Sequence, residues 1–190
     1  MKESKIYILL TDTGSFLTKL IKLYTNKPYN HASIALDSNL EEVYSFGRKN
    51  IHNPLNGGFV QEDVNSKLLN HARCAIYSLT VTDNQLQTIK NYIEEISAEK
   101  DAYHYNFLGL FGFVFNRPLT RKNSYFCSEF VASVLEGSNV IQFENSVSLV
   151  APHDLQELPD LRLEYEGSVN DYLMKGEPEN VSFSYPFIPA

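Results

Sequence analysis

The sequence predicts an α+β fold, because its strand-forming and helix-forming segments are grouped along the chain instead of alternating regularly. Short apolar runs rich in strand formers lie at residues 5–11 and, as a pair joined by a turn, at residues 31–36 and 42–46. A helix is predicted after Thr82, which can form a capping box with Gln85, because apolar residues then recur at helical spacing. A doubly wound sheet is therefore not expected.

The remaining segments follow from the same patterns. Strands are expected at residues 74–81 and 161–165, helices at 16–24 and 124–135, the second closing at Gly137, and a helical turn at 151–154. Residues 47–70 are broken by Asn-Pro and Gly-Gly pairs, and an irregular segment of this length is typical of a functional lid or rim. We expect one domain over residues 1–190, with a core at 5–167 and an extended surface tail at 168–190.

Composition narrows the class of protein. The 190 residues suit a single core, and contents of 43% hydrophobic and 13% aromatic residues are typical of a globular chain. A net charge of −7, with no basic tract longer than Arg121-Lys122, argues against nucleic acid as a partner. Two cysteines predict no disulfide framework, and the short apolar run near the N-terminus predicts no secretion signal, so a cytoplasmic location is expected.

Cys127 and His31 are the candidate catalytic pair. Cys127 lies in the first turn of a predicted helix, where unpaired backbone N–H groups and the helix dipole stabilise a thiolate. The backbone N–H of Cys127 is also free to donate to an oxyanion. His31 opens a predicted strand, and an imidazole beside the thiol could act as a general base. Taken singly, such a cysteine is more often a core residue and such a histidine a polar edge group.

The context of the pair resembles a known family. The motifs, in order behind a strand and a Thr-Gly-Ser turn, are Tyr29-Asn30-His31-Ala32-Ser33-Ile34-Ala35-Leu36, Tyr125-Phe126-Cys127-Ser128-Glu129-Phe130-Val131 and Ala151-Pro152-His153-Asp154-Leu155. Over residues 5–165 they resemble the YiiX/YycO-like branch of the permuted NlpC/P60 superfamily. The resemblance implies a permuted papain-like fold, with a mostly antiparallel sheet and the cysteine-bearing helix packed against it. It also implies hydrolysis or transfer of an amide or ester acyl group through a thioester, with Cys127 as nucleophile and His31 as base.

The resemblance further implies a polar residue on the strand after the histidine strand, which orients the imidazole. Ser45 is the predicted third member, and Glu41, which alternation places on the same face of the strand, is the alternative if the register slips. Serine can accept from an imidazole N–H, but it supplies no negative charge. The matching motifs place the substrate and its oxyanion near a set of short or polar residues: Thr13, Gly14, Ser15, Tyr29, Tyr125 and Ser128.

Two departures from the family pattern bear on the substrate. Relatives that cleave peptidoglycan carry an acidic residue before the cysteine and a glycine two residues after it, where this chain has Phe126 and Glu129. A cell-wall peptide is therefore not expected, and the substrate class stays at a small-molecule, peptide or lipid-like acyl compound. The apolar residues 106–113 could line an acyl-chain pocket, although a buried core helix is the simpler interpretation.

Other functions stay open at this point. A catalytically silent module that keeps the cleft for a ligand is favoured by the weak third member, Ser45. Membrane contact through residues 106–115 is a further alternative. The remaining histidines have no ligand spacing, so neither a metal nor another cofactor is expected.

Overall fold

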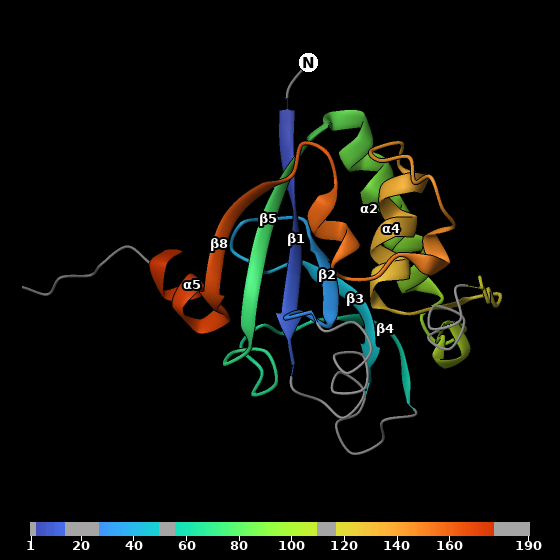
Figure 1. The fold of residues 1–190 in the computed structure, drawn as a ribbon, viewed down its shortest axis with the longest axis horizontal. Helices are drawn as coiled ribbons and strands as arrows, with labels where there is room; N and C mark the ends of the chain where they lie inside the picture. Colours follow the sequence, from blue (N-terminus) through green and yellow to red (C-terminus); the bar gives the residue numbers. More distant parts are fainter. Residues whose placement is uncertain (1–2, 14–26, 50–55, 110–116, 177–190) are drawn as a thin grey trace, which may run out of the picture.

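The computed structural model describes residues 3–13, 27–49, 56–109 and 117–176. Its main feature is a six-stranded antiparallel sheet with the strand order β4-β3-β2-β1-β5-β8 (Figure 1). The strands are β1 (Glu3–Asp12), β2 (His31–Ala35), β3 (Val43–Arg48), β4 (Gly57–Gln61), β5 (Arg73–Thr82) and β8 (Arg162–Ser168). The protein is thus a mixed α+β molecule with a mostly antiparallel sheet, as predicted.

Strand β1 lies inside the sheet and has two buried faces. It pairs with β2, where Thr11 lies opposite His31, and with β5 on its other side. Side chains alternate along a strand, so Ile8 and Leu10 face one side of the sheet and Leu9 faces the other. All three are fully buried. Burial on both faces explains why this strand is a continuous apolar run in the sequence rather than an alternating one.

One face of the sheet is covered by α2 (Asp83–Ala98) and α4 (Cys127–Gly137), which lie side by side in Figure 1. The capping box predicted at the start of α2 is confirmed. Gln85 N donates to Thr82 Oγ1 at 3.2 Å, and Thr82 N donates to Gln85 Oε1 at 3.0 Å. The buried stripe of α2 is Ile89, Ile93 and Ile96. Helix α4 packs against β2 and β3 and is buried along most of its length.

The opposite face carries α5 (Val169–Gly176), where the sequence analysis expected an extended tail. That expectation is wrong for these residues. Val169 is fully buried in a cluster with Leu9 and Ile76, and the hydroxyl of Tyr172 donates to Ser38 O at 2.8 Å. A helix of two turns shows too few periods to be recognised in a sequence, and its stability comes from this tertiary packing.

Both ends of α4 differ in detail from the prediction. The helix begins at Cys127, three residues later than expected, because β7 (Ser124–Tyr125) pairs in parallel with β6 (His104–Tyr105). Gly137 is the last helical residue, and the left-handed residue beyond it is Asn139, with φ of 53°. Two 3-10 turns follow, Val147–Leu149 and Asp154–Glu157, the second at the helical turn predicted around residues 151–154.

The segment 47–70 is more regular than its sequence suggests. It contains β4, which pairs with β3 so that Gly58 lies opposite Gly47, and turns then lead the chain to β5. Residues 50–55, like the Gly14-Ser15 turn and the predicted helix at 16–24, lie outside the described residues. Among the helices that the structure describes, none has the length and apolar character needed to cross a membrane.

Candidate active site

His31, the first residue of β2, faces a buried carboxylate. Its Nε2 atom lies 2.7 Å from Oε1 of Glu62, which follows β4 directly. Ser33 is two residues further along β2, on the same side of the strand, and its hydroxyl donates to Glu62 Oε2 at 2.7 Å. Ser45, from the neighbouring strand β3, donates to Glu62 Oε1 at 2.6 Å. Glu62 therefore ties three strands together at the histidine.

The Glu62 carboxylate is a buried anion with its acceptor positions occupied. Only 9% of its side chain is exposed. Burial by itself raises the pKa of Glu62, but the charge of His31 and the hydrogen bonds from His31, Ser33 and Ser45 lower the pKa below its ordinary value. An ionised carboxylate only accepts, so Nε2 of His31 carries the proton in this contact. Nδ1 is then the ring nitrogen left for another partner.

The direct partner of His31 is thus Glu62, whereas the sequence analysis predicted Ser45. The Ser45 hydroxyl bonds the carboxylate and acts on His31 only through it. The physical reason is the pairing of β4 with β3, which brings Glu62 to His31. The prediction had looked for the partner of His31 only on β3, the strand that follows β2 in the chain. The other alternative, Glu41, is exposed in the turn between β2 and β3, where its backbone N–H donates to Asp37.

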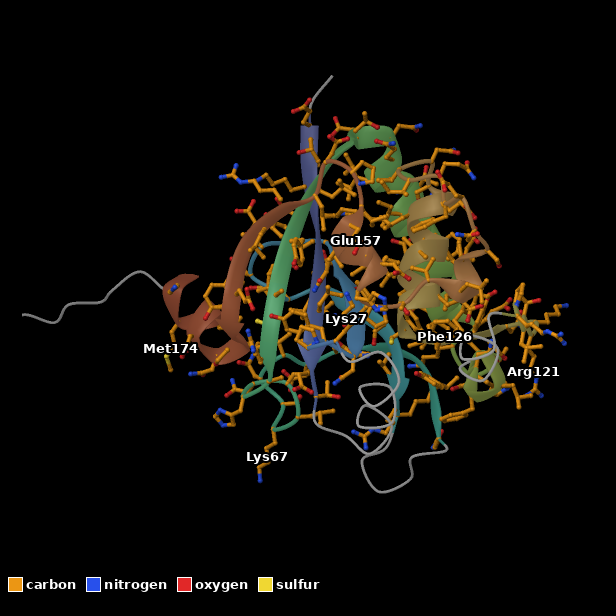
Figure 2. The ribbon with its side chains drawn as sticks, in the orientation of Figure 1. Lys27, Lys67, Arg121, Phe126, Glu157 and Met174 are labelled. Atoms are coloured by element: carbon orange, nitrogen blue, oxygen red, sulfur yellow. The ribbon has the colours of Figure 1, made fainter. Side chains whose placement is uncertain are left out.

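Cys127 is the first residue of α4 and is 3% exposed. Two contacts fix this first turn. Phe126, labelled near this end of α4 in Figure 2, donates its backbone N–H to Glu129 Oε2 at 3.2 Å, and the hydroxyl of Ser128 donates to Val150 O at 2.7 Å. The neighbouring backbone N–H groups of Ser128 and of Ala32 in β2 lower the pKa of the Cys127 thiol.

The Cys127 thiol and the His31 imidazole line the same cavity and lie close enough to shift each other's pKa. Burial raises the pKa of Cys127, but the neighbouring His31 imidazole and the two N–H groups outweigh burial and lower the pKa below its ordinary value. Burial lowers the pKa of His31, but Glu62 and Cys127 outweigh it and raise the pKa well above its ordinary value. These opposite shifts favour transfer of the thiol proton to the imidazole.

Tyr105 is a further side chain near the Cys127 sulfur, and it lines the same cavity. Burial and the nearby charge of Cys127 raise the pKa of its phenol well above the ordinary value, so the hydroxyl keeps its proton and can donate. The approach of Tyr105 depends on Gly57 in β4. A Cβ atom at Gly57 would lie only 2.8 Å from Tyr105 Cβ and 3.0 Å from Gly47 O. The Gly57-Gly58 pair therefore lets β6 pack closely on β4.

A cavity of about 300 Å³ opens onto Cys127, His31 and Tyr105. Other lining residues come from the segment predicted to be a lid or rim, namely Gly47, Arg48, Lys49, Val60, Gln61, Glu62, Asp63, Ser66, Leu68 and Leu69. The rim prediction is confirmed for these residues. The segment also supplies Glu62 to the site itself, which was not expected.

The structure separates the other predicted site residues. Thr13 lines the cavity, and Gly14 and Ser15 lie outside the described residues. Tyr29, Tyr125 and Ser128 are not among the described lining residues. Tyr29 is 4% exposed and donates to Glu166 Oε1 at 2.9 Å, and the ring of Tyr125 packs on Phe46 with centroids 5.1 Å apart. Ser128 uses its hydroxyl to hold α4 to Val150.

The apolar segment 106–115 is described only as far as Gly109. Asn106 is 2% exposed; its Nδ2 donates to Leu119 O at 3.1 Å and its Oδ1 accepts from Gly109 N at 2.9 Å. Leu108 is 59% exposed. None of residues 106–109 lines the cavity, and the rest of the proposed acyl-chain pocket lies outside the described residues.

Three residues of the site were not predicted from the sequence, and they differ in whether a sequence pattern could have indicated them. Ser33 had a signal, because the two-residue period of a strand places it beside His31. Glu62 had almost none, because it follows a five-residue strand rich in glycine that is recognisable only from its pairing with β3. Tyr105 had none, since its two-residue strand depends on β7, nearly twenty residues later.

No protein-family model matches this chain, and comparisons with curated proteins and with solved structures gave no significant match. Among the residues that the structure describes, no group of three or more His, Cys, Asp or Glu side chains is arranged to hold a metal ion. What the site can do follows from its own side chains: a thiol, an imidazole and a carboxylate in series, beside a cavity.

Proposed function

We propose that this protein is a cysteine hydrolase or acyltransferase of the permuted papain-like type, with Cys127 as nucleophile, His31 as general base and Glu62 as the residue that orients the imidazole. One observation carries the proposal. The Cys127 thiol lies beside the His31 imidazole, the imidazole is hydrogen-bonded to the buried Glu62 carboxylate, and thiol and imidazole both line one cavity. A nucleophile, its base and an orienting group in series are what acyl transfer through a covalent intermediate requires.

In the acylation step, His31 takes the thiol proton on Nδ1 and the Cys127 sulfur attacks the carbonyl carbon of an ester or amide. The carbonyl electrons move to oxygen, and the donors proposed to stabilise that oxyanion are the Cys127 backbone N–H, in the first turn of α4, and the protonated Tyr105 hydroxyl. The tetrahedral intermediate then collapses. The bond to the alcohol or amine breaks, His31 returns the proton to that leaving group, and a thioester is left on Cys127.

In the second step, His31 removes a proton from a water molecule or from an acceptor alcohol or amine. The acceptor attacks the thioester, and the thiol is regenerated with the acid or the transferred acyl product. The imidazole becomes positively charged in both steps. Glu62 stabilises that charge without taking the proton, because its own pKa is lowered by His31 and the two serine hydroxyls.

The binding-module alternative rested on the absence of a charged partner for the imidazole. Glu62 supplies that partner at 2.7 Å, so the ground for preferring a silent module no longer holds. We place the protein in the cytoplasm, since both cysteines are free thiols and a reducing compartment keeps them so.

Acyl-enzyme trapping tests the proposal. The protein is mixed with a panel of p-nitrophenyl esters and aryl amides, quenched in acid and analysed by mass spectrometry after proteolysis. We expect an acyl adduct on the peptide with Cys127, its loss in Cys127→Ser and its near-loss in His31→Ala. Cys74→Ser is the matched control and should keep the adduct. Native protein that forms no adduct at Cys127 and releases p-nitrophenol no faster than Cys127→Ser would exclude the proposed activity.

A further inference from the structure

We propose that the substrate carries an anionic group, a carboxylate or a phosphate, which binds Arg48 at the rim of the cavity. This inference rests on the proposed function and adds a substrate class to it. Arg48 is the last residue of β3 and lines the same cavity as Cys127 and His31. Its side chain is half-buried and has no hydrogen bond or ion pair with any residue that the structure describes.

An unpaired guanidinium in such a place points to a ligand. Partly buried arginines are normally matched by carboxylates or carbonyl groups, because their five N–H donors lose water when they are covered. The guanidinium fork binds carboxylate and phosphate groups through two parallel hydrogen bonds, which gives both strength and orientation. Arg48 therefore offers an anion site on the wall of a cavity whose nucleophile is Cys127.

Each of the neighbouring charged side chains has at least one hydrogen-bond partner. Lys49 donates to Lys100 O at 3.0 Å and lies 3.8 Å from Asp101 Oδ1. The Glu62 carboxylate is used by His31 and the two serines. Asp63 also lines the cavity, but its Oδ1 accepts from the backbone of Asn65 at 2.9 Å. Among the described lining residues, Arg48 is the charged side chain with neither a hydrogen bond nor an ion pair.

The rest of the cavity lining indicates the chemical character of the part of the ligand that does not contact Arg48. Phe46, Val60, Leu68 and Leu69 contribute apolar surface to the same cavity, which is at the small end of ligand pockets. An acyl compound with a short apolar body and an anionic end would match both features. The substrate class is therefore an anionic ester, thioester or amide rather than a neutral one.

Two alkylating reagents of nearly equal size give a direct test. Iodoacetate carries a carboxylate where iodoacetamide carries a neutral amide, and both react with the Cys127 thiolate. We measure both rate constants near pH 6 at fixed ionic strength, and divide the iodoacetate-to-iodoacetamide ratio by that of a free thiol. The native ratio should exceed that of Arg48→Gln by roughly ten- to a hundredfold, the effect of one charge-assisted hydrogen bond. Iodoacetamide alone should react equally with both proteins.

Lys49→Gln is the matched control, because it removes the same charge from the same rim while Arg48 stays. It should change the ratio less than about twofold, since its ammonium group is held by Lys100 and Asp101. Inorganic phosphate and acetate, added as competitors of iodoacetate, distinguish the two kinds of anion. The one that slows the reaction at the lower concentration identifies the group for which the site is built.

The outcomes separate this inference from the proposed function. A native ratio equal to that of Arg48→Gln, with Cys127 still reactive to iodoacetamide, overturns the anion site and leaves the enzyme. Cys127 that resists both reagents contradicts the proposed function instead. In that case isothermal titration with adipic acid monoamide and with hexanamide, which differ in one terminal carboxylate, decides the anion site. Binding of the first compound that is lost in Arg48→Gln supports it, and no binding overturns it.

Discussion

Glu62 holds the imidazole of His31 through a contact of 2.7 Å between Oε1 and Nε2, in a position where only 9% of the Glu62 side chain reaches solvent. The contact joins the end of β4 to the beginning of β2, with β3 between them in the sheet. A carboxylate buried to this degree stabilises the positive charge of the His31 imidazolium more than an exposed carboxylate can, because the local dielectric constant is lower. The acid–base behaviour of His31 is therefore set by a residue 31 positions away in the chain.

Replacing Glu62 by Gln should lower the pKa of His31 and slow the reactions of Cys127. Gln keeps the shape and can still accept a hydrogen bond, but the negative charge that stabilises the imidazolium is lost. We expect alkylation of Cys127 by iodoacetamide near pH 6 to fall roughly ten- to a hundredfold, the range for loss of one charge-assisted hydrogen bond. An NMR titration of the His31 ring protons measures the pKa change directly.

Glu166→Gln is the matched control for this substitution. Glu166 also binds a cation, Arg73, at 2.7 Å, but its side chain is 47% exposed and it lies on β8. The Glu166→Gln substitution should leave both the pKa of His31 and the rate of Cys127 alkylation unchanged. A Glu62→Gln protein in which His31 titrates as in the native protein would show that Glu62 does not govern the imidazole.

How far the fold could be predicted depended on how local each element is. The apolar run of β1 and the capping box of α2 each depend on residues that are neighbours in the sequence, so both elements could be predicted. Helix α5 and strand β4 are short, and what stabilises them is contact with distant parts of the chain: Leu9 and Ile76 for α5, and β3 for β4. Contacts of this kind cannot be predicted from the periodicity of apolar residues within one segment.

The site divides in the same way. Cys127 and His31 could be predicted as a pair because each lies in a motif with its own local context, and the structure brings both to one cavity. Glu62 was missed because its role requires two facts that only the fold supplies: that β4 exists, and that it ends beside β3. Gly57 was seen but misinterpreted, since a glycine that allows close packing within a strand looks the same in sequence as one in a turn.

Gly57→Ala should displace Tyr105 and weaken the site. The new methyl group would meet Tyr105 Cβ at 2.8 Å and the backbone oxygen of Gly47 at 3.0 Å, and neither is the flexible end of a side chain. We expect a loss of about 1–3 kcal/mol in the free energy of unfolding, typical of overpacking, measured by urea denaturation. Turnover of a p-nitrophenyl ester should fall further than stability, because the Tyr105 hydroxyl moves away from Cys127.

Gly47→Ala is a control on the neighbouring strand. Its Cβ would find its closest contacts at 3.6 Å, at Ser45 Oγ and Val60 Cγ2, which is ordinary van der Waals distance. The free energy of unfolding should change by less than about 1 kcal/mol. Equal losses for Gly47→Ala and Gly57→Ala would argue that any methyl group on these strands is harmful, and that the approach of Tyr105 has no special part in it.

The two cysteines should differ in reactivity by orders of magnitude. Burial raises the pKa of Cys74 to about 12, whereas His31 and two backbone N–H groups lower the pKa of Cys127. Each unit between two thiol pKa values gives about a tenfold difference in thiolate at a pH below both. Iodoacetamide near pH 6 should therefore label Cys127 almost exclusively, as read by peptide mass spectrometry.

Exposure does not explain this expected difference, since Cys127 is only 3% and Cys74 0% exposed. His31→Ala serves as the control, because it removes the imidazole while both thiols keep their places in the fold. It should abolish most of the selectivity for Cys127. Labelling that stays selective in His31→Ala would mean that the helix N-terminus alone activates the thiol, and His31 would lose its role as the base.

Glu129, in the first turn of α4, carries a carboxyl group that is only 3% exposed. Burial raises its pKa to about 7 from an ordinary 4.5, against the opposing effect of hydrogen bonds from Phe126 N and Asn106 Nδ2. Between these two values the folded protein binds a proton that the unfolded chain has released. The contribution of Glu129 to stability therefore falls as the pH rises from about 4.5 to 7, and it stays low above that.

Glu129→Gln removes this titration while keeping an oxygen for Phe126 N and Asn106 Nδ2. Urea denaturation at pH 5 and pH 8 should show the native protein losing on the order of 2 kcal/mol relative to the variant between these pH values. The difference between the two proteins is the relevant quantity, because Glu62 and His31 titrate in both and their effects cancel in it. Tyr105, the other ionisable group facing Glu129, keeps its proton throughout this range. Parallel stability curves from pH 5 to pH 8 would mean that Glu129 is ionised in the folded protein, and that the hydrogen bonds from Phe126 and Asn106 outweigh its burial.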